Sequence, residues 1–422
     1  MFKYVYNHFK DNLLISVWQS GFLFGRSTVT QLIELHTKFC TAVSEGKQIK
    51  VVFLDISKAF DRVWHKGLLF KLSKFGIRGN LLDWFTSYLE DRVQRVIING
   101  QFSEWTQIKA GVPQGSVLGP LLFLVFINDI VDVIHNCNVR LFADDTCLFI
   151  EIDSKDISEA KINEDLVSIE LWANSWLINF SAQKTKTMTL GTRNDAIPNI
   201  IFQNSPIEEV EEHKHLGLTF TSNLRWSKHI SSIEGKALKQ INIMKQLKFK
   251  LDRHSLETIY FSFIRPTIEY ADCIWYGSHD SDLDKLDRIQ IDAMRIVSGA
   301  TARSNINNLY EELAWPSLHE RRLKHSLCMM YKIVNGEAPP YLLDLLPTTV
   351  GNRSEYTTKL RSAHNIDDPL AKNSLQCLRR SFFPRTIREW NSIDHNTRNA
   401  QNLKSFKSLL SADSNAENSL FY

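Results

Sequence analysis

Two adjacent aspartates, Asp144 and Asp145, follow the apolar, strand-like residues 139–142 and precede another apolar run. A third, Asp55, comes directly after the apolar residues 51–54. Neighbouring residues of a strand point in opposite directions, so a tight turn is needed to bring both members of the pair to one site. Two-metal phosphoryl transfer needs such carboxylates, because Mg²⁺ prefers oxygen ligands and two ions hold the attacking and leaving oxygens in line. The pattern therefore predicts that these three aspartates bind two Mg²⁺ ions, with Mn²⁺ as a substitute.

Strand patterns lie beside these residues. Residues 50–54 are wholly apolar after the first, which is typical of a buried central strand. Residues 92–105 alternate around Asn99-Gly100, a dipeptide that favours the tight turn of a hairpin. Further short strands are predicted around Thr187 and Leu216.

Helical patterns connect and follow the strands. We expect helices within 27–40, over 66–89 with breaks near Gly76 and Gly79, over 117–136 and over about 158–177. Beyond about residue 223 the strand signal fades, and apolar residues recur at steps of three and four at Ile230, Ile233, Ala237, Ile241, Met244, Leu247 and Leu251. Strands, hairpins and helices intermingle in this way in an α+β domain rather than in a doubly wound sheet.

Composition narrows the class of protein. The 422 residues are 43% hydrophobic and include 10 Trp and 25 Phe, which argues against extensive disorder. The net charge is only +3, but residues 225–265 hold nine Lys/Arg against three Asp/Glu, a distribution that suits either a phosphate backbone or ordinary solvated helices. The six cysteines show no zinc-knuckle or disulfide spacing. No signal peptide or membrane span is evident, so we expect an intracellular, nuclear or cytoplasmic protein that is not secreted.

Several short motifs occur in a characteristic order. They are Gln19-Ser-Gly-Phe22 with Gly25-Arg-Ser-Thr28, Phe53-Leu-Asp55 with Ala59-Phe-Asp61, Gly111-Val-Pro-Gln-Gly-Ser116 with Leu118-Gly-Pro120, and Phe142-Ala-Asp-Asp145. An Asp-Asp pair alone is a common choice for a turn. The ordered set, with similar matches at Asn179, 184–186, 215–217, 263–275 and 382–391, resembles the reverse transcriptases of non-LTR (LINE-like, jockey- and CR1-type) retrotransposons over essentially the whole chain.

This resemblance implies an RNA-directed DNA polymerase that extends a DNA primer on an RNA template with deoxynucleoside triphosphates. The implied catalytic residues are Asp55, Asp144, Asp145 and Lys184. Lys184, or alternatively Lys186, would protonate or pair with the leaving pyrophosphate, although an ordinary surface lysine is an equal alternative. The implied nucleotide-binding residues are Arg26, Ile56, Phe60, Gln114 and Gly115.

The resemblance also implies specific roles for Phe60 and for a row of lysines. Phe60 stands at the family's steric gate, where a bulky ring excludes a ribose 2′-hydroxyl; outside this motif it would be read as a core aromatic. A basic stripe would follow the phosphate backbone of the primer and template, and it comprises Lys236, Lys239, Lys245 and Lys248.

The resemblance also implies a right-hand polymerase architecture. It comprises partial fingers (1–49), a palm (50–220), a helical thumb (221–310) and a C-terminal helical, basic extension (311–422). Relatives carry a further fingers segment before the motif at Gln19, so we expect an N-terminally truncated polymerase. A catalytically inactive remnant that retains only the fold and nucleic-acid binding is the alternative. No obligate protein partner, oligomeric state, template preference or role for residues 311–422 can be inferred from the sequence.

Overall fold

The computed structural model describes residues 1–191, 199–353, 362–367, 370 and 374–418. The chain divides into two compact units, each built from two stretches of sequence. Unit 1 consists of Met1–Thr28 and Lys47–His213, and unit 2 consists of Val29–Gly46 and Lys214–Tyr422. Residues 29–46 are thus grouped with the second half of the chain.

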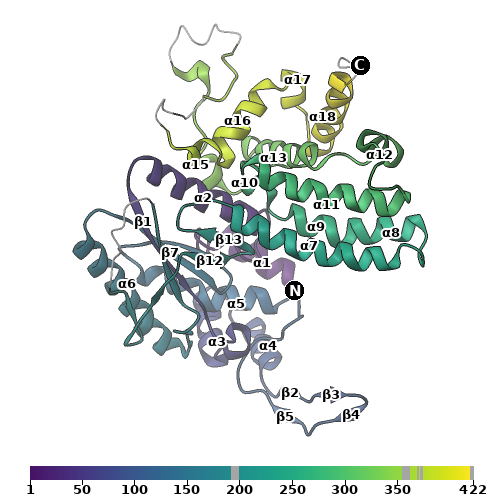
Figure 1. Ribbon diagram of the computed structural model, residues 1–422. Helices are drawn as coiled ribbons and strands as arrows, with labels where there is room; N and C mark the ends of the chain where they lie inside the picture. Colours follow the sequence, from purple (N-terminus) through teal and green to yellow (C-terminus); the bar gives the residue numbers. More distant parts are fainter. Residues whose placement is uncertain (192–198, 354–361, 368–369, 371–373, 419–422) are drawn as a thin grey trace. The chain divides into compact units, whose positions relative to one another are not determined.

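A five-stranded sheet forms the centre of unit 1, in the order β11-β8-β1-β7-β6. Figure 1 labels two of its neighbouring strands, β1 and β7. Strand β1 (Gln48–Leu54) is completely buried and pairs in antiparallel fashion with β7 (Asp145–Ile152) and β8 (Lys186–Leu190). The predicted central strand is therefore confirmed. Strand β6 (Asn138–Phe142) pairs with β7, and the short β11 (Glu208–Glu209) runs parallel to β8.

Helices pack around this sheet and share one apolar core with it. They are α1 (Phe2–Asp11), α3 (His65–Lys74), α4 (Asn80–Leu89), α5 (Gly119–Ile127) and α6 (Lys155–Trp176), with the 3₁₀ helices η1 (Ala59–Arg62) and η2 (Asn128–Val133). The break expected between α3 and α4 is present. The single helix expected over 117–136 is not: the α-helix ends at Ile127. The Asn128 side chain accepts a hydrogen bond from Ser16 N–H and donates one to Leu14 O, so it is held by a distant loop.

A two-stranded arm extends from unit 1 beyond α4 (Figure 1). Strands β2 (Val93–Gln94) and β5 (Thr106–Gln107) pair, as do β3 (Ile97–Ile98) and β4 (Gln101–Phe102). Both Asn99 and Gly100 have positive φ, at +50° and +80°, as the predicted tight turn requires. The predicted hairpin is confirmed.

Unit 2 is mainly helical. Its elements are α2 (Thr28–Ser44), β13 (Leu218–Thr221), α7 (Ser227–Leu247), α8 (Arg253–Ile259), the π-helix η3 (Tyr260–Ile264), α9 (Arg265–Glu269), α10 (Asp272–Trp275), α11 (Asp280–Ser298), α12 (Ile306–Leu313), α13 (Leu318–Val334), α14 (Pro340–Leu343), the 3₁₀ helix η4 (Val350–Arg353), α15 (Gln376–Arg379), α16 (Phe382–Ser392), α17 (His395–Arg398) and α18 (Leu403–Asn418). The boundary between the units falls in β12 (Glu212–His215). The strands expected around Leu216 are present as β12 and β13, and Leu216, with φ of +45°, lies in the turn between them.

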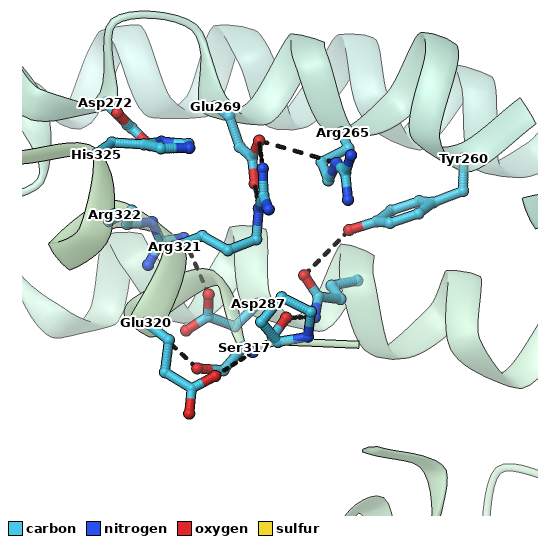
Figure 2. A network of polar contacts seen from close by, with 12 residues as sticks. Tyr260, Arg265, Glu269, Asp272, Asp287, Ser317, Glu320, Arg321, Arg322 and His325 are labelled. Atoms are coloured by element: carbon cyan, nitrogen blue, oxygen red, sulfur yellow. Dashed lines mark hydrogen bonds and ion pairs between the residues drawn. The ribbon is translucent and has the colours of Figure 1, made fainter. Parts of the chain in front are cut away.

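A network of buried and partly buried polar groups connects α9, α10, α11 and α13 (Figure 2). Glu269 accepts two hydrogen bonds from Arg321, one of them at 2.8 Å. Arg322, only 1% exposed, donates to Asp287 at 2.9 Å. His325 Nδ1 lies 2.7 Å from an Asp272 carboxylate oxygen. Each of these carboxylates is matched by at least one basic side chain.

Taken together, helices and mainly antiparallel strands are mixed in the described residues. The expected α+β class is therefore confirmed.

Candidate active site

The turn between β6 and β7 carries the aspartate pair. Phe142 and Asp145 are the last residues that pair across the hairpin, so Ala143 and Asp144 form its two-residue connection. Ala143 has φ of +56°, a backbone conformation that residues with a Cβ atom seldom adopt. The turn places Asp144 at the tip and Asp145 at the first position of β7.

Asp55 comes to the same end of the sheet because β1 and β7 are antiparallel neighbours. Leu54, the last residue of β1, pairs with Thr146. Asp55 follows directly after β1, and Asp145 directly precedes Thr146 on β7, so the two carboxyl groups are close enough for the charge of Asp55 to act on Asp145. The structure thus brings together three carboxyl groups from positions up to 90 residues apart in the sequence.

Burial and mutual repulsion raise the pKa values of the pair. Burial contributes most to the pKa of Asp145, and together with the charges of Asp144 and Asp55 it raises that pKa to about 6. Burial also raises the pKa of Asp144, partly offset by a backbone hydrogen bond and increased by Asp55. Carboxyl groups perturbed by burial and like charge are concentrated at functional sites.

Lys184 is the basic residue that faces this group. Its Nζ lies 3.4 Å from Asp55 Oδ2, and its side chain is 70% exposed. That oxygen is buried and accepts no hydrogen bond from the described residues. Lys186, the alternative from the sequence, is instead paired with Glu208 at 2.6 Å. One lysine can offset only one of the three negative charges.

The carboxyl groups fit a divalent cation by their chemistry. Within the described ranges, no three His, Cys, Asp or Glu side chains are already arranged to hold a metal ion. The Asp55 oxygen without a hydrogen bond, and the repulsion that raises the pKa of Asp145, are nevertheless features that a hard cation with oxygen ligands would relieve.

An aromatic cluster holds Phe60 beside this end of the sheet. Phe60, on η1, is partly buried and stacks on Phe123 of α5 with ring centroids 4.5 Å apart. Phe22 contacts the same ring edge-on at 6.0 Å. Phe60 O accepts a hydrogen bond from Val112 N–H, so the ring and the loop at 111–116 are positioned together.

The loop at 111–116 presents Gln114 and Gly115 at the surface. Gln114 Nε2 donates to Asp61 Oδ1 at 2.8 Å, a partner to which the sequence assigned no role although it stands in the Ala59-Phe-Asp61 motif. Gly115 has φ of +80° and open space around it. Gly111, by contrast, packs closely against another part of the backbone, because a Cβ atom there would lie 2.7 Å from Asp61 O.

The remaining nucleotide-binding candidates make local contacts. Ile56 is 7% exposed, its side chain belongs to the core of unit 1, and its backbone forms an isolated antiparallel bridge with Phe180. Arg26 Nη1 donates to the carbonyl oxygens of Gln19 and Val17. Arg26 therefore supports the loop at 17–19.

The four candidate lysines lie on or next to α7 in unit 2. Lys236 and Lys239 are exposed, whereas Ile230, Ala237 and other residues of the apolar stripe are buried. Lys245 pairs with Asp292 at 3.6 Å. Lys248 is partly buried just after the helix.

None of the helices in the described part of the chain combines the length and apolar character needed to cross a bilayer.

Three carboxyl groups thus gather at the strand ends, and the loop that contains Pro113-Gln-Gly115 contacts Phe60 and Asp61, which follow Asp55 in the sequence. Residues 3–220, more than half of the chain, match the family "Reverse transcriptase (RNA-dependent DNA polymerase)". The chain belongs to this family.

The curated relatives are polymerases of mobile elements. The RNA-directed DNA polymerase from mobile element jockey of Drosophila melanogaster is 30% identical over 319 residues, which cover 73% of this chain and 34% of the relative. The probable RNA-directed DNA polymerase from transposon X-element of the same species is 28% identical over 316 residues, with 73% and 35% covered. The resemblance to reverse transcriptases of non-LTR retrotransposons is confirmed. The chain spans about a third of the length of these relatives.

Among solved structures, telomerase from Candida tropicalis in complex with a TWJ fragment of telomeric RNA aligns with a TM-score of 0.41 and 12% identity. The alignment covers 77% of this chain and 54% of the telomerase chain. This similarity is too low to support an inference.

Proposed function

We propose that this chain is an RNA-directed DNA polymerase, which extends a DNA primer on an RNA template with deoxynucleoside triphosphates. The observation that carries the proposal is the group of three carboxylates at the ends of β1 and β7, with the pKa of Asp145 raised to about 6. Membership of the reverse transcriptase family supports the same activity.

Asp55, Asp144 and Asp145 are the residues that would hold two Mg²⁺ ions, or Mn²⁺. The chemistry that such ions would supply is charge neutralisation on the triphosphate and activation of the primer 3′-oxygen. The turn sets the spacing of Asp144 and Asp145, while Asp55 approaches from the neighbouring strand. The Lys184 ammonium, 3.4 Å from Asp55, is suited to protonate the leaving pyrophosphate or to pair with it.

The nucleotide pocket in this proposal is formed by Phe60 and the loop at 111–116. Stacking on Phe123 fixes the Phe60 ring, as a steric gate against the ribose 2′-hydroxyl needs. Gln114 is exposed beside it, and Gly115 leaves room for a base or sugar. Ile56 contributes through its backbone, and Arg26 through the loop that it supports.

The architecture proposed from the family is partial fingers (1–49), palm (50–220), thumb (221–310) and C-terminal extension (311–422). Buried β1 and the aspartate turn support the palm assignment, and the helical content after residue 221 supports a thumb. Exposed Lys236 and Lys239 on α7 are suited to a phosphate backbone, with Lys245 and Lys248 nearby along the helix.

The test is primer extension on an RNA template with Mg²⁺, using the 422-residue chain beside its Asp144→Asn variant. We expect extension by the chain and a loss of roughly 10³-fold in the variant, because several kcal/mol of transition-state charge stabilisation disappear. Binding to an RNA–DNA duplex, measured by fluorescence anisotropy at two salt concentrations, should stay within about twofold.

Glu151→Gln is the matched control. Glu151 lies on the same strand as Asp145 and pairs with Lys47 at 2.7 Å, away from the turn. Its substitution should leave extension unchanged. Equal extension by the chain and by Asp144→Asn would refute the site, whereas duplex binding without extension by either would favour the inactive remnant.

A further inference from the structure

The loop at 18–21 runs alongside the aspartate turn. Leu141 N–H donates to Trp18 O at 3.0 Å, and Ser20 N–H donates to Leu141 O at 2.8 Å. Gln19 thereby forms an isolated parallel bridge with Leu141 at the edge of β6. Both segments belong to unit 1, although 122 residues separate Gln19 from Leu141 in the sequence.

One side chain satisfies both backbone polar groups of Ala143. Gln19 Oε1 accepts hydrogen bonds from Ala143 N–H at 2.8 Å and from Gly21 N–H at 2.7 Å. Gln19 Nε2 donates to Ala143 O at 3.3 Å. Gln19 is 1% exposed, so these hydrogen bonds are shielded from water.

Gly21 allows this contact because it lacks a side chain. A Cβ atom at Gly21 would lie 2.3 Å from Ala143 N and 3.0 Å from Ala143 Cα. Ala143 itself is 4% exposed and has φ of +56°. A disfavoured backbone conformation persists where the surroundings hold it, and here Gln19 and Gly21 supply those surroundings.

Ala143 and Asp144 are the two residues of the turn, so the peptide between them sets the direction of the Asp144 side chain. Its carbonyl is the group that Gln19 Nε2 holds. We propose that Gln19 is a positioning residue of the polymerase, which locks the Ala143 backbone and so fixes the spacing of Asp144 and Asp145. This inference rests on the proposed function and adds a residue to its machinery.

The primary test replaces Gln19 by Met, which has similar length and offers no amide. We expect the turnover number in primer extension to fall about 10–100-fold, because small misplacements of catalytic groups are costly. The KM for deoxynucleotide and the affinity for the RNA–DNA duplex should stay within about twofold. A general folding defect would instead lower the active fraction, which a pre-steady-state burst measures separately.

Hydrogen–deuterium exchange provides a readout that does not need activity. The Ala143 amide should exchange at least about tenfold faster in Gln19→Met than in the unchanged chain, while amides in β1 and β8 keep their protection. Unchanged protection of Ala143 would overturn the proposal. So would faster exchange combined with an unchanged turnover number.

One further variant keeps the test decisive if Gln19→Met folds poorly. Gly21→Ala leaves the amide intact but forces Ala143 away, so it should reproduce the exchange and turnover defects. Normal behaviour of Gly21→Ala would count against the proposal.

Gln31→Met is the matched control. Gln31, on α2, is fully buried, and its side-chain amide has no hydrogen-bond partner among the described residues. This variant should change neither Ala143 exchange nor extension.

If the unchanged chain does not extend primers, the proposed function fails, and Mn²⁺ binding by electron paramagnetic resonance then decides the role of Gln19. Weaker Mn²⁺ binding in Gln19→Met, together with faster Ala143 exchange, would support the positioning role of Gln19. Unchanged Mn²⁺ binding would overturn that role.

Discussion

The aspartate turn of unit 1 and the polar network of unit 2 differ in how many basic side chains accompany their carboxylates. At the turn, three carboxyl groups have one lysine as an ion-pair partner among the residues that the structure describes, and the pKa of Asp145 is raised to about 6. In the network, Glu269 accepts hydrogen bonds from Arg321 and also lies 3.9 Å from Arg265. Asp272 is paired with His325 (Figure 2). Asp287 accepts a hydrogen bond from Arg322.

This difference in pairing distinguishes carboxylates that stabilise the fold from carboxylates that are suited to bind a ligand. A buried carboxylate that is matched by a cation holds helices in register and leaves nothing for a ligand to neutralise. Carboxylates gathered without enough cations cost stability, and folding alone gives no reason to keep them. The turn therefore has the character of a ligand site, and the network that of a scaffold.

The largest effect is expected in the network. Glu269→Gln leaves Arg321 and Arg265 without their carboxylate in a mostly buried setting, where the Glu269 side chain is 10% exposed. We expect the free energy of unfolding to fall by about 3–5 kcal/mol, measured by urea denaturation at pH 7.

Glu312→Gln provides the surface comparison for that change. Glu312 pairs with Arg253 at 3.1 Å, but both side chains are about half exposed. Its loss should cost less than about 1 kcal/mol. Similar costs for the two variants would mean that the network is no more structural than a surface pair.

A pH effect of intermediate size is expected from His36 in unit 2. Burial, helped by Arg385, lowers the pKa of His36 to about 3. The unfolded chain takes up a proton near pH 6.5 and the folded chain does not, so this stability is complete above pH 6.5 and is lost as the pH falls toward 3. Between pH 7 and pH 5 we expect a loss of about 2 kcal/mol from this group.

Urea denaturation at both pH values tests this contribution. In His36→Gln the difference between pH 7 and pH 5 should shrink by about 2 kcal/mol. The exposed His395, replaced in the same way, should leave the difference unchanged. An undiminished difference in His36→Gln would place the acid sensitivity elsewhere.

The smallest effect, of opposite sign, is expected at the turn. Asp145→Asn removes one of three like charges, so in a chelating buffer it should raise the free energy of unfolding. The gain should be no more than about 1 kcal/mol, because Asp145 keeps an exposed surface that solvent screens, although the surrounding protein partly desolvates its carboxyl group. A clear loss of stability would show that Asp145 is a structural carboxylate like Glu269, and the contrast between the two regions would fail.

Local patterns predicted the elements that depend on nearby residues. The apolar run before Asp55 indicated a buried central strand, and Asn99-Gly100 indicated the hairpin, because burial on both faces and positive φ each demand particular residue types. The helix expected over 117–136 instead ends at Ile127 and continues as a 3₁₀ helix, next to a contact with a distant segment. Asn128 is held by Leu14 and Ser16, more than 100 residues away, and no local pattern announces that contact.

In the candidate site, too, residue identities could be predicted from the sequence, whereas contacts between distant segments could not. The motifs named Asp55, Asp144, Asp145, Phe60 and Gln114 by their resemblance to a family. The burial of the Ile56 side chain and the pairing of Gln114 with Asp61 depend on how separate segments pack.

The sequence by itself determined which residues could do chemistry, since residue type, turn preference and apolar period are properties of short segments. Only the tertiary structure decided which of them meet. Antiparallel pairing of β1 with β7 brings Asp55 beside Asp145, and the contact of Gln19 with Ala143 joins segments 124 residues apart. Such contacts come from packing of the whole unit, whose energy is spread over many distant residues and so leaves little trace in any single stretch of sequence.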